Sequence, residues 1–531
     1  MKIKRLWVSQ NRCLKDFNIE FDTSDSGTST ILIGGNGTGK TTLIETILEI
    51  VCSFDSLGSE MEPKYDYIFE YEFRRCNVVI KKEKQNYSLI INDNLYSTGT
   101  LDQIINYIER EKITILPQRV MALYSGRNEK IRHVCVCADK FALFTDNYIA
   151  SLFDDDKEWI ALFRRSNQTI LKSTYNYFSD DIVPILLISI LGGEESKAKR
   201  YLLNFTQFSS INSMRIQINL KNLETHLYKQ NKTVNLMDLF YIIVDIFDNR
   251  FTSLLKNTLV SSSAYYAHFH INNIQQYNFD SVSLFNFFAL LKNYLHAKID
   301  LTISFGTDYV DYHNISEGQM QLIKILGMMG ICKDEDCLVL VDEPDAHMNP
   351  TWKYQISNII EDLLEDALFT HALITTHEPL VINGVKKEKI KIFQKKEIHQ
   401  DTGISYATDV ITPKEDIVGW GIDGILQSEY FGLESSLDEN TKNKMKLKYD
   451  LLVKKKDGTL TDLEKEDLKL ITTELESMIF ARNIPTDIYY DEYVAAMHKI
   501  YSETQSTPLT AGDITERNNK AEEILRGLLK I

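Results

Sequence analysis

The sequence predicts an α/β fold in which a mostly parallel β-sheet carries a phosphate-binding loop. An antiparallel β subdomain, a helical insertion and a helical C-terminal region accompany this sheet. The apolar run Ile31–Ile33 enters the glycine-rich loop Gly34–Gly39, and an amphipathic helical pattern follows. Two later strand patterns, Cys337–Val341 and Ala372–Thr376, each lead into titratable side chains, with a helical pattern between them. Alternating strands and helices favour a parallel sheet covered by helices.

Bulk composition sets wide limits on this fold. With 531 residues, 44% of them hydrophobic and 25% charged, the chain can build several domains around a large core. Its formal net charge of −16 argues against a surface that coats DNA. The seven cysteines include no Cys-x-x-Cys pair, which argues against a disulfide framework or zinc site and fits a cytoplasmic protein.

The sequence gives no sign of a membrane segment. Met1–Arg5 lacks the apolar core that would follow in a signal peptide. The apolar run Ile182–Leu191 is about half as long as the ~20 residues of a spanning helix, and it contains a proline. We therefore expect no membrane partner.

Changes of pattern divide the chain into four segments. Short strands near the N-terminus and between Tyr67 and Ile91 indicate an antiparallel sheet, and Lys112–Leu116 reads as a further strand. Helical patterns dominate the middle, without sustained heptads; they fall at Asn147–Phe153, Val183–Leu191, Val234–Phe247 and Ser281–His296. We expect an N-terminal lobe over 1–130, a helical insertion over 131–298, a C-terminal lobe over 299–412 and a C-terminal helical region over 413–531.

The C-terminal region contains a predicted helical hairpin. Asp438–Lys455 and Thr461–Met478 are two charged helical stretches joined through Asp457 and Gly458. Thr461 and Glu464 have the spacing of a capping box at the start of the second helix.

The glycine-rich loop matches G-x-x-x-x-G-K-[ST] between a strand and a helix, which is the context of a P-loop. Glycines allow consecutive backbone N–H groups to turn toward one point, and the following helix adds its positive N-terminal end. Lys40 is expected to reach the β- and γ-phosphates, and the Thr41 hydroxyl to hold Mg²⁺. The predicted ligands are therefore a nucleoside triphosphate, which the family resemblance described below implies is ATP, and Mg²⁺. They are expected to be bound by Gly34, Gly35, Asn36, Gly37, Thr38, Gly39, Lys40, Thr41 and Thr42.

An Asp-Glu pair ends the apolar strand Cys337–Val341. Asp342 is expected to hold Mg²⁺, and Glu343 to polarise the water that attacks the γ-phosphate. A surface Asp-Glu at a strand end would be unremarkable by itself. The apolar residues before it and the P-loop upstream favour the catalytic interpretation.

Ser316-Glu317-Gly318-Gln319 opens a predicted helix, and Ser316 alone could be an ordinary N-cap. Its place before the Asp-Glu strand resembles the signature motif of ATP-binding-cassette (ABC) ATPases in their SMC/RecF-like form. The resemblance implies that Ser316, Gly318 and Gln319 contact the γ-phosphate held by a second subunit. The resemblance continues along the chain: Asp345 matches the family's D-loop aspartate, and His377 matches its switch histidine.

Gln118 is the candidate for the family's Q-loop glutamine, which contacts Mg²⁺ and the attacking water. In the family, P-loop and signature helix lie on opposite sides of the core, so one chain does not close its own site. The resemblance therefore implies a homo-oligomer built from head-to-tail ATPase dimers.

Several short segments resemble the PtuA family, the ATPases of the Septu anti-phage system and of retrons with the same gene pair. These segments are Leu116-Pro117, Tyr124–Gly126, Ser316–Gln319, Asp342–Pro350, Ile425-Leu426 and Tyr430–Leu433. The resemblance implies a separate HNH nuclease as partner and, in retrons, a reverse transcriptase with its RNA–DNA product. The C-terminal helices are the expected docking surface for this partner, because they are charged and form a separable region. The alternative is an OLD- or RecF-like DNA-dependent ATPase or ATPase-nuclease of DNA repair or restriction, although no nuclease motif follows residue 380.

Overall fold

The computed structural model describes residues 1–22, 28–54, 62–126, 128–138, 175–221, 223, 235–245, 248–263, 265–332, 335–367, 369–400, 403–433, 438–477, 493, 496–497, 500 and 511–529. The predicted helix Asn147–Phe153 lies outside these residues. The chain divides into two compact units. Unit 1 comprises Met1–Val381 and Phe393–Ile411, and unit 2 comprises Ile382–Ile392 and Thr412–Ile531. The expected C-terminal region, 413–531, differs from unit 2, which also includes Ile382–Ile392.

The central sheet of unit 1 has seven strands in the order β18-β17-β3-β16-β15-β8-β9. Their bounds are β3 Thr28–Gly34, β8 Arg119–Tyr124, β9 Tyr175–Tyr177, β15 Cys337–Asp342, β16 His371–Thr376, β17 Ile390–Gln400 and β18 Gly403–Ile411. Strands β3, β16, β15, β8 and β9 pair in parallel, with Asp342 opposite both Thr375 and Tyr124. The carboxyl ends of these strands thus meet at one edge, where open α/β sheets bind ligands.

A second sheet of unit 1 is antiparallel, in the order β2-β1-β4-β5-β6-β7. Its strands are β1 Lys2–Asn11, β2 Leu14–Glu20, β4 Tyr67–Phe73, β5 Cys76–Glu83, β6 Asn86–Ile91 and β7 Asn94–Gly99, followed by α2 Leu101–Arg110 and later α3 Glu129–Ala138. Strict alternation of buried and partly exposed residues in β4 reflects one packed face. The predicted combination of a mostly parallel sheet and an antiparallel subdomain is confirmed.

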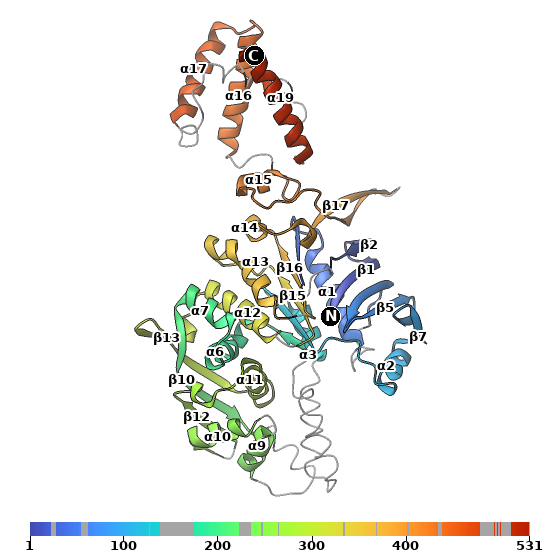
Figure 1. Ribbon diagram of the computed structural model, residues 1–531, viewed down its shortest axis with the longest axis vertical. Coiled ribbons are helices and arrows are strands. Elements are labelled where there is room, and N and C mark those ends of the chain that lie inside the picture. Colours follow the sequence, from blue (N-terminus) through green and yellow to red (C-terminus); the bar gives the residue numbers. More distant parts are fainter. Residues whose placement is uncertain are drawn as a thin grey trace. The chain divides into compact units, whose positions relative to one another are not determined.

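Two separate cores cover the two faces of the central sheet. Alternate residues of β15 point into them: Leu338 and Leu340 pack in the core that contains α1 (Lys40–Ser53). Val339 and Val341 pack in the core that contains α12 (Glu317–Ile331) and α13 (Pro350–Leu364). The P-loop helix and the helix after Ser316 therefore lie on opposite faces of the sheet (Figure 1).

The segment expected as a helical insertion is mixed rather than helical. It contributes three strands to a five-stranded antiparallel sheet in the order β11-β12-β10-β13-β14. These strands are β10 Phe208–Asn219, β11 Leu259–Ser262, β12 Tyr266–Ile271, β13 Lys298–Phe305 and β14 Asp308–Asp311. The physical signal for β10 is that Met214, Ile216 and Ile218 recur with the period of a strand.

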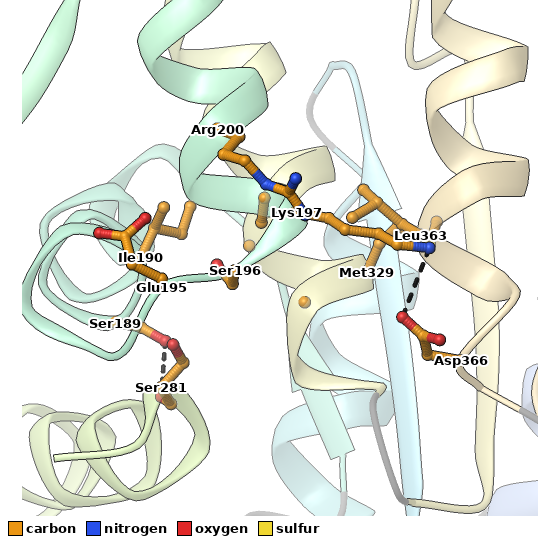
Figure 2. Close-up of a pocket in the computed structure, with 13 residues that line it drawn as sticks. Ser189, Ile190, Glu195, Ser196, Lys197, Arg200, Ser281, Met329, Leu363 and Asp366 are labelled. Atoms are coloured by element: carbon orange, nitrogen blue, oxygen red, sulfur yellow. Dashed lines mark hydrogen bonds and ion pairs between the residues drawn. The ribbon is translucent and has the colours of Figure 1, made fainter.

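Helices and short 3₁₀ turns pack around this third sheet. Their bounds are η1 Asp180–Ile182, α6 Val183–Gly192, α7 Lys197–Thr206, α9 Leu236–Asp245, α10 Asn249–Thr258, η2 Gln275–Tyr277, α11 Ser281–Leu295 and η3 Tyr312–Asn314. A cavity of about 260 Å³ lies among α6, α7, α12 and α13. Lys197 crosses it to Asp366 at 3.4 Å and also contacts Asp362 at 3.2 Å, so these ion pairs tie α7 to the end of α13 (Figure 2).

Unit 2 is formed mainly by helices. Its elements are α14 Pro379–Ile382, which crosses the boundary, η4 Lys387–Lys389, α15 Ile422–Gln427, α16 Glu439–Lys456, α17 Asp462–Ser477 and α19 Ala511–Leu529. Helices α16 and α17 pack as a hairpin through Leu451, Ile471 and Leu475. The capping box is present, because Thr461 Oγ1 accepts from Glu464 N at 3.3 Å and Glu464 Oε2 accepts from Thr461 N at 2.8 Å. Within the described part of the chain, the helices are too short or too polar to cross a membrane.

A buried histidine ties the N-terminal strand to the central sheet. His371 is fully buried, its Nδ1 accepts from Ile3 N at 3.0 Å, and its Nε2 lies 3.1 Å from Thr30 Oγ1. Burial, with the nearby N-terminal ammonium, lowers the pKa of His371 from 6.5 to about 3. The folded state therefore keeps this imidazole neutral.

We expect His371 to make the protein less stable in mild acid. As pH falls from 6.5 towards 3, the unfolded chain binds a proton at His371 that the folded chain does not. The free energy of unfolding should then fall, with a slope from this group that steepens below pH 6.5 to at most about 1.4 kcal/mol per pH unit. Urea unfolding at several pH values between 7 and 5 measures the slope. His371→Gln should show a shallower slope, and parallel slopes for the two proteins would contradict this origin.

Candidate nucleotide-binding site

The loop after β3 is shaped for close approach of a ligand to its backbone. Gly34, Gly37 and Gly39 have positive φ angles of 148°, 74° and 103°. A Cβ on Gly39 would lie 2.8 Å from Thr408 Oγ1 and 3.0 Å from Cys13 Sγ, and one on Gly34 would collide with the Phe393 carbonyl. Residues 35–37 form an exposed tip, and Thr38 Oγ1 closes the turn by donating to Gly35 O at 2.8 Å. Glycine is therefore favoured by conformation at all three positions, and at Gly34 and Gly39 it is also required by space.

Lys40 is the first residue of α1 and is 6% exposed. Its Nζ donates to Gly34 O at 2.7 Å and Gly35 O at 3.3 Å, so the side chain folds back along the loop. Burial lowers the pKa of Lys40, and the carboxylates of Glu343 and Asp342 counteract this shift. A buried ammonium held by neutral carbonyls is well placed to exchange them for phosphate oxygens.

Thr41 meets Asp342 at the edge of the sheet. Thr41 Oγ1 donates to Asp342 Oδ2 at 2.7 Å, and the hydroxyl of Thr375 donates to Asp342 Oδ1. Asp342 is 2% exposed, and burial raises its pKa although both hydroxyls counteract the shift. Hydroxyl and carboxylate oxygens are the ligands that Mg²⁺ prefers, so this pair fits the predicted metal.

Glu343 stands directly after β15 in a left-handed conformation, with φ 52°. Its backbone N donates to Thr375 O and Thr375 Oγ1, both at 3.1 Å. These contacts hold a φ value that is costly for a residue other than glycine. Glu343 Oε1 lies 3.1 Å from His377 Nδ1, and both side chains are partly exposed. The predicted catalytic carboxylate and switch histidine are therefore in contact beside Asp342.

Asp345 is buried against the end of β16. Thr376 Oγ1 donates to Asp345 Oδ1 at 2.9 Å, next to His377, and burial raises the pKa of Asp345. The following turn also contacts the signature helix, because a Cβ on Gly318 would lie 2.6 Å from His347 O.

Ser316 caps the exposed start of α12. Its Oγ accepts from Gln319 N at 3.3 Å, while Gln319 Oε1 accepts from Ser316 N at 3.1 Å. Because α12 and α1 pack on opposite faces of the sheet, Ser316, Gly318 and Gln319 are not gathered with Lys40 in one chain.

The prediction for Gln118 is corrected by the topology. Residues 112–118 form no strand, and Gln118 immediately precedes β8, whose first residue pairs with Cys337 at the start of β15. Asp342 lies five residues further along β15, roughly 17 Å away at ~3.3 Å per residue in a parallel strand. Gln118 is thus at the opposite edge of the sheet from the site, because the strand begins after it rather than before it.

Tyr124 and Ser125, rather than Gln118, lie beside Asp342 at the end of β8. Tyr124 pairs with Asp342, and Ser125 N donates to Asp342 O at 3.2 Å. They border a polar cavity of about 410 Å³ that Lys324 and Asp180 also line. Sequence reasoning also missed Thr375 as a partner of Asp342. The sequence feature that indicates Thr375 is the pair of hydroxyl side chains, Thr375-Thr376, at the end of an apolar strand.

Comparisons with known proteins show what the chain is similar to. The family described as "AAA domain, putative AbiEii toxin, Type IV TA system" matches residues 160–383. The chain is similar to the Septu protein PtuA of Bacillus mycoides (strain KBAB4), with 21% identity over 234 residues, 43% of this chain and 30% of PtuA. It is also similar to the Retron Vc95 probable ATPase of Vibrio cholerae serotype O1 biovar El Tor, with 27% identity over 105 residues, 18% of this chain and 20% of that protein. The matches thus span less than a third of either relative.

Solved structures of SMC heads are also similar to the chain. The Smc head bound to the C-winged helix domain of ScpA gives a TM-score of 0.34 at 11% identity, covering 78% of this chain and 98% of that one. The Smc head with an extended coiled coil, bound to the C-terminal domain of ScpA derived from Pyrococcus furiosus, gives 0.33 at 14% identity, covering 77% and 96%. The family and sequence matches support the relationship to defence-associated P-loop ATPases that the motifs indicate.

Proposed function

We propose that this chain binds and hydrolyses ATP with Mg²⁺ as the regulatory ATPase of an anti-phage defence complex. The observation that carries the proposal is the cluster at the carboxyl edge of the central sheet. Lys40 and Thr41 from the P-loop helix meet Asp342 and Glu343 there, and His377 contacts Glu343.

Each side chain has a distinct role in this proposal. Lys40 holds the β- and γ-phosphates, and the hydroxyl of Thr41 with the carboxylate of Asp342 holds Mg²⁺. The metal neutralises charge on the phosphates when it is bound. Glu343 orients the attacking water and accepts its proton, and His377 positions Glu343 from a distance of 3.1 Å.

The proposal includes a head-to-tail pair of chains. Ser316 is exposed at the start of α12, and α12 and α1 pack on opposite faces of the sheet. Ser316 of a second copy would complete the site at the P-loop of the first copy. Because the pair is symmetric, it would contain two such sites.

Subunit mixing tests this pairing. Lys40→Met and Ser316→Arg are each expected to abolish ATP hydrolysis when present in every chain. In a mixed pair, one site keeps Lys40 from one chain and Ser316 from the other, so mixing should restore roughly a quarter of wild-type phosphate release if pairing is random. A mixture that stays as inactive as its two components would contradict shared sites. Lys40→Met mixed with Asp342→Asn is the matched control, because both of those changes lie on the same side of a site.

The regulatory part of the proposal concerns a separate HNH nuclease and, if a retron is present, a reverse transcriptase with its RNA–DNA product. The similarity to the Septu protein PtuA and the Retron Vc95 probable ATPase supports this assignment. We propose unit 2 as the docking region, since its exposed apolar side chains include Leu447, Leu463 and Leu470. Co-purification of a candidate HNH nuclease with the wild-type chain and with Leu463→Asp tests the assignment. Reduced capture by Leu463→Asp is expected, and equal capture by both proteins would contradict docking at this surface.

A further inference from the structure

We infer that Lys395 is a second lysine that binds the triphosphate of ATP, contributed within the same chain by β17. The inference rests on the proposed function and adds a phosphate-binding residue that lies outside the nucleotide motifs. Lys395 Nζ lies 3.7 Å, and its Cε 3.9 Å, from the position that a Cβ on Gly37 would occupy. Gly37 belongs to the exposed tip of the P-loop, so this ammonium stands beside the backbone that would receive phosphate.

The strand that carries Lys395 is fixed directly against the P-loop. The Phe393 carbonyl and Cβ are the nearest neighbours of a Cβ on Gly34, and the Phe393 ring packs on Phe17 at 6.0 Å. Residues 393 and 395 lie on the same side of a β-strand, because side chains alternate between its faces. Phe393 therefore packs against the beginning of the P-loop at Gly34, and Lys395 lies beside the exposed tip of the loop at Gly37.

The adjacent strand holds the other side of the loop. Thr408 Oγ1 on β18 donates to Thr38 O at 2.7 Å, and Thr408 N donates to Cys13 O at 3.0 Å. The loop is thus held at Gly34 by β17 and at Thr38 by β18, with Gly37 between these two points. These two attachments fix β17 and β18 beside the loop, and with them the backbone from which the Lys395 side chain extends.

The charges around Lys395 favour an anionic ligand. Lys395 is exposed, and the described residues provide no carboxylate within ion-pair distance of it. Arg12, also beside the loop, is already engaged, because its Nη1 lies 2.7 Å from Glu45 Oε2. A lysine ammonium is a compact, mobile charge that binds phosphate well. The position of Lys395 therefore suits contact with a phosphate of the bound nucleotide.

The test compares ATP affinity and nucleotide-free unfolding temperature among full-length variants. Lys395→Met should weaken ATP binding about tenfold or more, the loss expected for a charge-assisted hydrogen bond. Lys395→Arg should retain most of the affinity, because it keeps the charge. Lys396→Met is the matched control, since its side chain points from the other face of β17 and should leave affinity unchanged. The unfolding temperature without nucleotide should be the same in all four proteins.

Two outcomes would overturn the inference. ATP affinity of Lys395→Met equal to the wild type would show that the ammonium does not contact the nucleotide. A joint loss of affinity and unfolding temperature, unrelieved by arginine, would show a structural role instead. In both cases Lys40→Met separates this inference from the proposed function. Loss of ATP binding in Lys40→Met leaves the proposed function standing, whereas retained binding would remove both.

Discussion

Replacing Lys40 with methionine is expected to abolish detectable ATP binding at ordinary protein concentrations. Removing one member of a buried, charge-assisted contact costs about 2–5 kcal/mol, which is roughly a 30- to 5,000-fold loss of affinity. Lys40 is 6% exposed, and its Nζ donates to Gly34 O and Gly35 O, so its ammonium already lies against the loop that would receive the phosphates. Titration calorimetry with ATP measures the loss.

Stability separates this effect from unfolding. Burial lowers the pKa of Lys40, which means that its charge opposes folding when no nucleotide is bound. Methionine keeps the apolar stem without the charge, so the unfolding temperature without ATP should not fall. Lys298→Met, an exposed change on β13, is the control for loss of a lysine. ATP affinity in Lys40→Met close to that of the wild type would remove Lys40 from the site.

Replacing Glu343 with glutamine is expected to separate ATP binding from ATP hydrolysis. A positioned general base contributes about 10²- to 10⁴-fold to a rate, so phosphate release should fall by at least ~100-fold. Glutamine keeps the length of the side chain, and the backbone contacts of residue 343 with Thr375 do not depend on its charge. ATP affinity should therefore remain.

The same variant should accumulate the ATP-bound pair of chains, because hydrolysis no longer opens it. Size-exclusion chromatography with light scattering, with and without ATP, measures this shift. Glu365→Gln is the control, since Glu365 is 71% exposed and pairs with Lys197 away from the site. Hydrolysis at the wild-type rate in Glu343→Gln would assign the base to another residue.

Residues next to each other in the sequence were easier to place than residues that meet through the fold. Lys40 and Thr41 are fixed by one loop and one helix start, and Asp342 and Glu343 by one strand end. Such local patterns have a single geometry, so their positions could be predicted. His377 could be placed for the same reason, since the buried strand β16 ends beside it.

The features that the sequence did not reveal depend on where strands begin and on which strands become neighbours. Gln118 was misplaced because the strand starts at Arg119, and that boundary moves a residue to the other edge of the sheet. Lys395 approaches Gly37 across more than 350 residues of chain, so no short motif indicates the contact. The strand Phe208–Asn219 was missed because a helical pattern dominates its surroundings and masks its own period of two.

The contact between Gly318 and the carbonyl of His347 has a consequence for how two active centres would behave together. The first turn of α12 cannot move away from the turn that contains Asp345 without losing this close packing. In a head-to-tail pair, the start of α12 would face the neighbour's centre, whereas Asp345 lies beside Thr376 and His377 of its own chain's centre, so the block would join the two centres. Filling one centre would therefore prepare the other, and ATP titrations should be steeper than a single-site curve. A larger residue at position 318, such as valine, should separate the block and flatten that curve.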